Sequence, residues 1–300
     1  MARLISLVED DHPALPEVMA ELAADTGRAH VIGLTGAPGV GKSTTTSALV
    51  SAYRRRGHRV GVLAVDPSSP FSGGALLGDR IRMSEHAADP GVFIRSMAAR
   101  GHLGGLSRAT PQALRVLDAA GCDVVLVETV GVGQSEVEIT ALADTVVVLL
   151  APGMGDGIQA AKAGVLEIGD VLVVNKADRD GADATVKDLR HMVQMGDRSA
   201  PGLWRPRIVR AVAIQGSGVD DIVEAVAAHW DWLGEDGLHQ RRLVRAAAEI
   251  EALALEKLRS SLTGDQNSTL SELAEAVVAG VLDGYAAADR LVATITARAH

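Results

Sequence analysis

Seven short apolar runs, rich in β-branched residues, alternate along the chain with segments that have helical patterns. The runs are VIGLT at 31–35, VGVLAVD at 60–66, VFIRS at 92–96, CDVVLVET at 122–129, DTVVVLLAP at 144–152, DVLVVNKAD at 170–178 and RIVRAVAI at 207–214. Runs that are apolar on both faces are typical of a parallel sheet that helices cover on each side. The pattern therefore predicts a doubly wound α/β fold with a mostly parallel sheet.

Helical patterns without strands occupy both ends of the chain. Residues 1–29 are expected to form one or two short helices, and Pro13 and Pro16 suit helix starts. Residues 234–300 contain two or three further helical patterns, and residues 30–233 form the α/β domain between these extensions. The C-terminal helices either pack on the α/β domain or act as a homodimerisation arm, and the sequence leaves both alternatives open.

The first apolar run leads into a glycine-rich sequence that matches a P-loop. GAPGVGKS follows a predicted strand and opens a predicted helix, which is the context that makes a GxxxxGK[ST] match specific. Backbone N–H groups and the positive end of the helix attract phosphates, Lys42 is expected to reach the β- and γ-phosphates, and the Ser43 hydroxyl is expected to bind Mg²⁺. The expected nucleotide contacts are Gly36, Ala37, Pro38, Gly39, Val40, Gly41, Lys42, Ser43 and Thr44.

Acidic residues at the carboxyl ends of two predicted strands are candidates for the metal site, because open α/β sheets bind ligands at that edge. Asp66 ends one run and is expected in the magnesium shell, and Glu128 ends another and is expected to hold a metal-bound water. Asp79, in a glycine-rich segment, is a further candidate metal contact. Each acid has a simpler alternative, which is to cap a turn or to face solvent.

The segment that follows Glu128 is a candidate sensor of the γ-phosphate. The backbone N–H of Gly131 is expected to contact that phosphate, so the position of VGVGQSEVE would depend on it. Gln134 is a candidate for positioning the attacking water. Since no arginine finger is assigned in cis, we expect intrinsic GTP hydrolysis to be slow. Its rate should rise when a partner orders this segment and residues 153–162.

The sixth run ends in Asn175-Lys176-Ala177-Asp178, an NKxD element that predicts guanine recognition. The carboxylate of Asp178 accepts hydrogen bonds from the ring N–H and the exocyclic amine, Asn175 braces the loop, and the Lys176 stem lies on the base. Adenine would leave that carboxylate unpaired, which rejects it by roughly 10⁴-fold or more. Ala213 is expected to bring a backbone N–H near the guanine carbonyl. The predicted ligands are GTP or GDP with Mg²⁺.

Composition narrows the class of partner and the compartment. With 300 residues and 47% hydrophobic content, the chain can bury one large core and a smaller satellite. A net charge of -9 and 2% aromatic residues argue against a nucleic-acid surface.

The single cysteine, Cys122, excludes a disulfide framework and disfavours a cysteine-based metal site. No run approaches the roughly 18 apolar residues of a membrane span, so we expect a cytoplasmic protein without a membrane partner.

Five segments together resemble the MeaB/ArgK/MMAA family of GTPases associated with methylmalonyl-CoA mutase. They are GAPGVGKST, VDPSSPFSGGALLGDRIRM, ETVGVGQSEVE, PGMGDGIQAAKAG and NKAD, within about residues 20–235. The resemblance implies a homodimeric GTPase of the SIMIBI-like class, which includes the signal-recognition-particle and MinD-like proteins. It also implies binding to the adenosylcobalamin-dependent mutase, gating of cofactor delivery, and protection or reactivation of that enzyme.

The family's third switch matches here at Asp156, Gln159 and Lys162, within GDGIQAAK. The resemblance implies a catalytic role for Lys162, whereas its position one turn into a predicted helix also suits an ordinary surface lysine. Gly157 stands where the family usually has an acidic residue, so the sequence departs from the family pattern in the loop that is expected to respond to the partner.

Three other functions compete with the mutase-associated GTPase. A kinase for a transport protein or a small molecule, which is the older label of the same family, would transfer phosphate to an acceptor other than water. A metal-delivery GTPase predicts tracts rich in histidine or cysteine, whereas the nine histidines of this chain are scattered. A structural protein with a vestigial nucleotide site would fail to hydrolyse GTP.

Overall fold

The computed structural model describes most of the chain and divides it into two compact units. The described residues are 1–66, 83–98, 109–129, 138–153, 165–195, 202–263 and 267–298. The first unit is Met1–Arg242 and the second is Leu243–His300. The side chain of Asp66 also lies outside the described part, although its backbone belongs to a strand.

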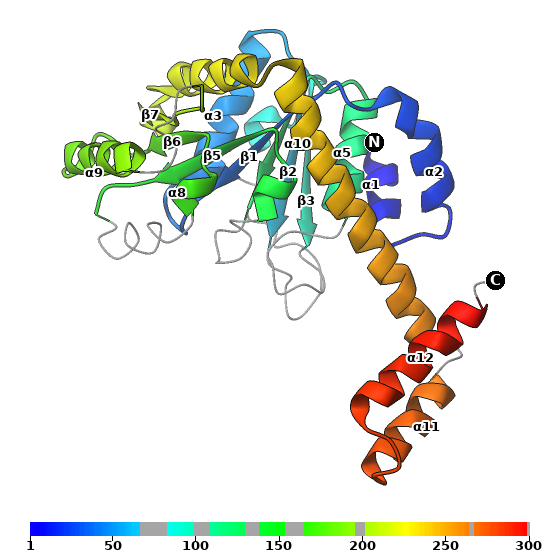
Figure 1. Cartoon of the computed structure of the whole chain (residues 1–300). Helices are drawn as coiled ribbons and strands as arrows, with labels where there is room; N and C mark the ends of the chain where they lie inside the picture. Colours follow the sequence, from blue (N-terminus) through cyan, green and yellow to red (C-terminus); the bar gives the residue numbers. More distant parts are fainter. Residues whose placement is uncertain are drawn as a thin grey trace. The chain divides into compact units, whose positions relative to one another are not determined.

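A sheet of seven parallel strands forms the centre of the first unit (Figure 1). Its order is β3-β2-β4-β1-β5-β6-β7, and each pairing between neighbours is parallel. The strands are β1 (His30–Thr35), β2 (Val60–Asp66), β3 (Val92–Ala98), β4 (Val124–Glu128), β5 (Thr145–Leu150), β6 (Val171–Val174) and β7 (Arg207–Arg210). The predicted doubly wound α/β fold is confirmed, with a strand in each of the seven predicted runs.

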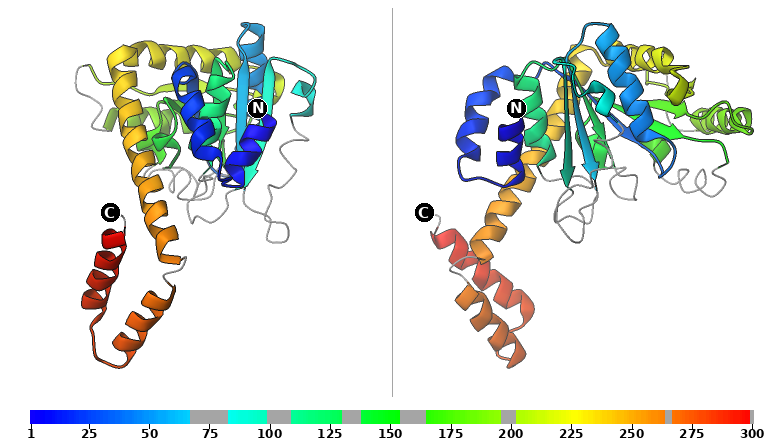
Figure 2. Two further views of the ribbon diagram at one scale, coloured as in Figure 1. Left: turned by 90° about the vertical axis from the view of Figure 1, so that its right-hand side faces the viewer. Right: turned by 180° about the vertical axis from the view of Figure 1, so that it is seen from behind.

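Helices cover both faces of this sheet (Figure 2). One buried cluster joins a sheet face to α1, α5 and α9, and a second joins the other face to α3 and the first part of α10. The helices are α1 (Ala2–Glu9), α2 (Leu15–Leu22), α3 (Lys42–Arg55), α5 (Thr110–Ala119), α8 (Val165–Ile168), α9 (Ala182–Met195), α10 (Val219–Thr263), α11 (Asn267–Val278) and α12 (Gly284–Arg298). The described residues also include the 3-10 turns η1 (Ala23–Asp25), η2 (Ser84–His86), η3 (Ile139–Ala141) and η5 (Ala213–Gln215).

The two ends of the chain are helical, as the sequence predicts. At the N-terminus, Pro16 lies in the first turn of α2, where its missing N–H costs no helical hydrogen bond. Near the C-terminus, Gly234 has φ 56 and ψ -170 and interrupts α10. This interruption coincides with the predicted domain boundary at 234, whereas the compact units divide between Arg242 and Leu243. The three-part division of the chain stays a prediction.

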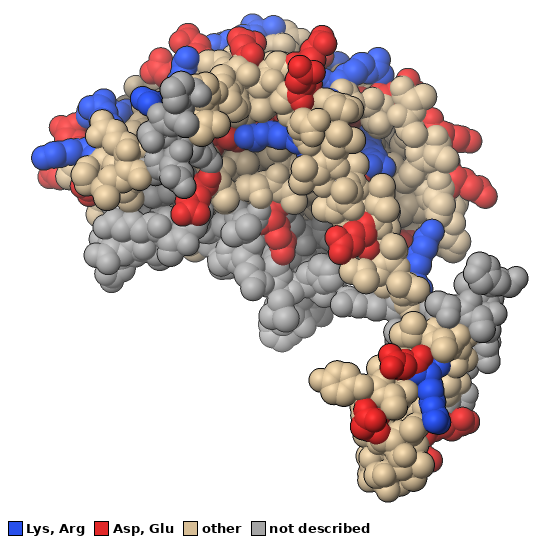
Figure 3. Space-filling model, in the orientation of Figure 1, with Lys and Arg blue, Asp and Glu red and all other residues tan. Residues whose placement is uncertain are grey.

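The surface of the described residues carries both signs of charge. In the face shown by Figure 3, acidic and basic side chains are interspersed between uncharged ones. Cys122 is buried and unpaired. Among the described helices, none combines the length and the apolar character that crossing a membrane requires.

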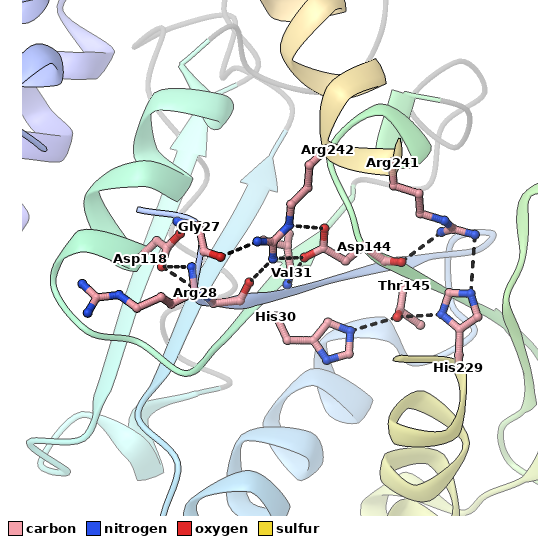
Figure 4. Close-up of polar contacts among 11 residues, drawn as sticks. Gly27, Arg28, His30, Val31, Asp118, Asp144, Thr145, His229, Arg241 and Arg242 are labelled. Carbon is pink, nitrogen blue, oxygen red and sulfur yellow. Dashed lines mark hydrogen bonds and ion pairs between the residues drawn. The ribbon is translucent and has the colours of Figure 1, made fainter. Parts of the chain in front are cut away.

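Asp144, which directly precedes β5, binds α10 to the sheet (Figure 4). Its Oδ2 accepts the Val31 N–H at 3.0 Å and lies 3.2 Å from Nη2 of Arg242. The same arginine donates to the carbonyl oxygen of Ala29 at 3.0 Å. Because Asp144 is only 1% exposed, this carboxylate satisfies a strand N–H and a helix arginine in a buried setting.

Asp170, which directly precedes β6, makes the equivalent contact near the next strand. Its Oδ2 accepts the Val146 N–H at 2.9 Å, and its two oxygens accept the two Nη groups of Arg241, each at 2.9 Å. Burial alone would raise the pKa of this carboxyl, but hydrogen bonds from His229 and Arg241 outweigh burial and lower the pKa to about 2. Asp170 is therefore ionised at pH 7.

The substitution Asp170→Asn is expected to remove a contribution to stability that depends on pH. The folded pKa of about 2 lies below the ordinary aspartate value of 3.8, so the carboxylate stabilises the fold above about pH 4 and loses this effect as the pH falls through 2. At about 1.4 kcal/mol per pKa unit, the contribution at pH 7 is about 2 kcal/mol. The free energy of unfolding in denaturant should show the loss at pH 7 and about half of it at pH 3.

The control for this measurement is Asp183→Asn, which removes an exposed carboxylate paired with Arg210. It should change the free energy of unfolding by less than about 1 kcal/mol at either pH. An effect of Asp170→Asn that is equal at pH 7 and pH 3 would contradict the assignment.

Candidate functional site

The P-loop lies at the carboxyl edge of the sheet, between β1 and α3. The chain moves from β1 toward β2 on one side and later toward β5 on the other, so this loop lies where the strand order reverses. Gly36 and Gly41 have φ values of 141 and 96, which disfavour other residues. A Cβ on Gly41 would also collide with Nδ2 of Asn175, and one on Gly36 with the carbonyl oxygen of Leu149. The predicted glycine-rich cradle therefore fits a phosphate chain held by backbone groups.

Lys42 lies along this cradle and is largely buried. Its Nζ donates to the carbonyl oxygen of Gly36 at 2.8 Å and to that of Ala37 at 3.3 Å. Phosphate oxygens carry a full negative charge and are stronger acceptors than these carbonyls. The residue is also the first of α3, so the positive end of that helix acts at the same place. Lys42 is thus placed to exchange loop carbonyls for nucleotide phosphates.

Ser43 on α3 and Glu128 on β4 meet beside the cradle. The Ser43 hydroxyl donates to Oε1 of Glu128 at 2.6 Å, and the Thr46 hydroxyl donates to Oε2 at 3.0 Å. Glu128 is 5% exposed. A serine that donates its proton to a carboxylate keeps its oxygen lone pairs for a cation, and this donor set suits Mg²⁺. Direct contact between Glu128 and a metal-bound water stays a prediction.

Asp66 ends β2 at the same edge of the sheet. Its strand pairs with β4 in a register that places Ala64 opposite Glu128, so the backbone of Asp66 lies beyond Glu128 on the neighbouring strand. This position suits the predicted magnesium shell. Several predicted site residues lie outside the described part of the chain, namely Asp79, Gly131, Gln134, Asp156, Gly157, Gln159 and Lys162.

The NKxD element follows β6 and is bonded directly to the P-loop. Nδ2 of Asn175 donates to the carbonyl oxygen of Val40 at 2.8 Å, and Nζ of Lys176 donates to that of Gly39 at 2.6 Å. Lys176 has a φ of 56, which is uncommon for a residue with a side chain. The structure therefore brings together the two motifs that the sequence places about 135 residues apart.

Asp178 and Ala213 complete the predicted guanine site. Asp178 is exposed, as a residue that must reach a ligand should be, whereas Asn175 is buried. We predict the Ala213 N–H near the guanine carbonyl. In the structure this N–H donates to Oδ1 of Asn175 at 3.1 Å. Ala213 therefore helps to hold the Asn175 side chain in place. A contact between Ala213 and guanine stays a prediction.

Thr46 is a site residue that the sequence reasoning missed. It lies three positions after Ser43 on α3, so both hydroxyls face the same side of the helix and share Glu128. That spacing of two hydroxyl residues in the first turns of the P-loop helix is the signal that would have identified it. Neighbouring Ser47 similarly holds His86, whose Nε2 lies 2.9 Å from the Ser47 hydroxyl.

Comparison with known proteins gives consistent matches along the chain. A family model described as "Methylmalonyl Co-A mutase-associated GTPase MeaB" matches residues 1–267. A Pyrococcus horikoshii protein is 46% identical over 99% of this chain and 94% of its own length. GTPase ArgK of Escherichia coli is 39% identical over 75% of this chain and 70% of its own length. The crystal structure of a LAO/AO transport system kinase matches with a TM-score of 0.69 and 28% identity, covering 98% of this chain and 92% of that one.

Proposed function

This chain belongs to the family of the methylmalonyl-CoA mutase-associated GTPase MeaB, and we propose that it couples magnesium-dependent GTP hydrolysis to the chaperoning of an adenosylcobalamin-dependent mutase. Its GTPase activity follows from the family and its relatives, and the mutase is the partner in the family's name. The observation that carries the nucleotide chemistry is the pair of bonds from Asn175 to Val40 and from Lys176 to Gly39. These bonds fix the guanine-reading loop against the phosphate cradle.

The proposed mechanism relies on positioning and charge rather than on covalent chemistry. Lys42 and the N–H groups of the cradle hold the β- and γ-phosphates in one orientation. Ser43 and Asp66 would hold Mg²⁺, and Glu128 fixes the rotamer of Ser43 through its hydrogen bond. Bound Mg²⁺ would supply charge neutralisation at the transferred phosphoryl group.

Residues after Glu128 and in the third switch are proposed to connect hydrolysis to the partner. Gly131 would contact the γ-phosphate, Gln134 would position the attacking water, and Lys162 would respond to the mutase. Since we assign no arginine of this chain as an arginine finger, intrinsic GTP turnover should be slow and should rise when the mutase binds. The site of action proposed for this pair of proteins is the cytoplasm.

The second compact unit supports a homodimer as the working form. Its surface exposes large apolar side chains, of which Val278 is 90%, Val281 74% and Tyr285 87% exposed. Exposed apolar surface of this kind marks interaction sites, and a second copy of the same chain is the most common occupant.

A pull-down with methylmalonyl-CoA mutase and adenosylcobalamin tests the proposed function. The tagged chain should retain the mutase in a manner that differs between GTP, GDP and a non-hydrolysable GTP analogue, and the mutase should raise GTP turnover by roughly tenfold or more. Light scattering on the eluted complex counts the protomers. Absence of a complex with all three nucleotides would reject the chaperone role, and phosphate transfer to an acceptor other than water would favour the kinase alternative.

A further inference from the structure

A cavity of about 460 Å³ lies at the amino ends of β1 and β4, at the edge of the sheet opposite the P-loop. The last turn of α3 and the first turns of α10 form its sides. Its apolar lining comes mainly from Val124, Val223, Val226 and Ala227, together with the rings of Tyr53 and Trp230. The size and apolar character match those of small-molecule sites, which hold about 300–1,000 Å³. Nothing in GTP hydrolysis uses this cavity.

Tyr53 contributes its phenol ring and hydroxyl to the lining of this cavity. The residue is 5% exposed and lines the cavity, and no hydrogen bond among the described residues involves its hydroxyl. Burial raises the pKa of the phenol above its ordinary value, against the opposing effect of Arg56, so the hydroxyl stays protonated. A phenol hydroxyl can donate one hydrogen bond and accept another, so this group has the capacity to bind a polar ligand in the cavity.

His30 supplies an acceptor in the same cavity. Burial lowers its pKa to about 4, despite the opposing effect of Asp144, so the ring is neutral at pH 7. Its Nε2 lies 2.9 Å from Oγ1 of Thr145, which lies 2.9 Å from Nδ1 of His229 (Figure 4). Nε2 of His229 lies 3.3 Å from a carboxylate oxygen of Asp170 and 3.4 Å from Nη2 of Arg241. We assign the proton to Nε2, because its hydrogen bond to Asp170 contributes to the low pKa of that carboxyl. The Thr145 hydroxyl then donates to His229 and accepts from His30, which leaves Nδ1 of His30 as an acceptor.

Aromatic rings form part of the lining of this cavity. The rings of His30 and Trp230 pack with their centroids 4.1 Å apart. The whole chain has three tryptophans, two tyrosines and two phenylalanines, so Tyr53 and Trp230 are two of only seven such residues. Aromatic faces attract organic cations because their π-electrons are negative.

The arginines at the rim of the cavity are already paired. Arg28 lies 3.7 Å from Asp25, and Arg56 lies 3.2 Å from Asp220, which also faces Arg55 at 3.5 Å. A ligand anion would have to compete with these carboxylates. Arg28 with Asp25 carries no net charge, and the two arginines that share Asp220 keep one positive charge between them.

The charge that remains at the rim is negative. Glu224 and Asp231 on α10 line the cavity and have no ion pair or hydrogen bond among the described residues. Asp123 accepts the Arg59 N–H at 2.7 Å. The cavity also lies at the carboxyl end of α3, where the helix dipole is negative. The helix that is predicted to attract phosphate at one end thus favours a cation at the other.

We propose that this cavity binds a small organic cation that carries an ammonium or guanidinium group on an apolar or aromatic body. The cationic group donates hydrogen bonds to Nδ1 of His30 and the hydroxyl oxygen of Tyr53. Its body lies against Trp230 and the valines, and Glu224 and Asp231 balance its charge. The site is separate from the guanine nucleotide site, so the proposal stands or falls independently of the proposed chaperone role.

A matched set of three probes tests the charge and the place of binding. The probes are 2-phenylethylammonium, 2-phenylethanol and 3-phenylpropionate, which share one ring and differ in charge. The full chain has three tryptophans and therefore three indole N–H signals in a ¹H–¹⁵N NMR spectrum, of which Trp230→Phe identifies one. We expect the cation to shift the Trp230 signal saturably, and the alcohol and the anion to bind at least roughly tenfold more weakly.

Variants connect that binding to the named groups. The variant Tyr53→Phe should weaken binding of the cation by roughly 3- to 10-fold. The double variant Glu224→Gln with Asp231→Asn should weaken it by a similar factor. The control is Tyr285→Phe, which removes the hydroxyl of the other tyrosine, one that is exposed in the second unit. GTP turnover and thermal unfolding should be unchanged in all of them. An anion that binds as tightly as the cation, a Trp230 signal that does not move at millimolar probe, or equal effects of the two tyrosine variants would each overturn the proposal.

Discussion

Asp178→Asn is expected to weaken GTP binding by roughly 10²- to 10⁴-fold, because the carboxylate is predicted to accept two hydrogen bonds from guanine. The asparagine amide has one oxygen and one NH₂ group, so one guanine donor would face another donor. Asp178 is exposed and follows the buried brace at Asn175, so the fold should tolerate the change. Calorimetric titration with GTP and GDP measures the loss directly.

Binding of xanthosine triphosphate by Asp178→Asn distinguishes a change in base specificity from a general loss of nucleotide binding. Xanthine has a carbonyl where guanine has the exocyclic amine, so the asparagine NH₂ has an acceptor to face and the ring N–H retains the amide oxygen. The variant should bind this nucleotide at least roughly tenfold more tightly than GTP. Asp180→Asn, an exposed neighbour, should leave the preference for GTP intact. An unchanged affinity of Asp178→Asn for GTP would contradict the guanine assignment.

The strands were predictable because a strand that is buried on both faces is a continuous apolar run. The observed strands are shorter than the runs at several ends, as at Asp144 and Asp170, which precede β5 and β6. These aspartates bind arginines of α10 that lie 98 and 71 residues later in the chain. No periodic or local pattern encodes a pairing over that distance, so the sequence could not reveal this attachment of α10.

The P-loop and the NKxD element were readable because each is a short contiguous motif with a known chemical purpose. Asn175 was predicted as a brace without its acceptor, and Lys176 was predicted only to lie on the base, so its bond to Gly39 was not predicted. The cavity beside Tyr53 and His30 had no such signal. Its lining comes from separate segments of the chain that only the fold brings together.

Glu128→Gln is expected to slow GTP hydrolysis by roughly 100-fold and to raise the Mg²⁺ concentration required for half of the maximal rate. In the native site both carboxylate oxygens accept hydrogen bonds, from Ser43 at 2.6 Å and from Thr46 at 3.0 Å. Glutamine has nearly the same shape but only one acceptor oxygen, so its NH₂ group faces one of the two hydroxyls. The substitution also removes a negative charge from the edge where the cation is expected.

Single-turnover hydrolysis at a series of Mg²⁺ concentrations measures both effects, and Thr46→Ala provides the comparison. The threonine variant leaves the bond between Ser43 and Glu128 in place, so its rate should fall by less than roughly fivefold at saturating Mg²⁺. If Glu128 only held α3 against β4, the two variants would lose similar stability and retain the native requirement for Mg²⁺. A rate for Glu128→Gln within threefold of the native rate would therefore remove Glu128 from the metal site, because the orientation of Ser43 would then not depend on its charge.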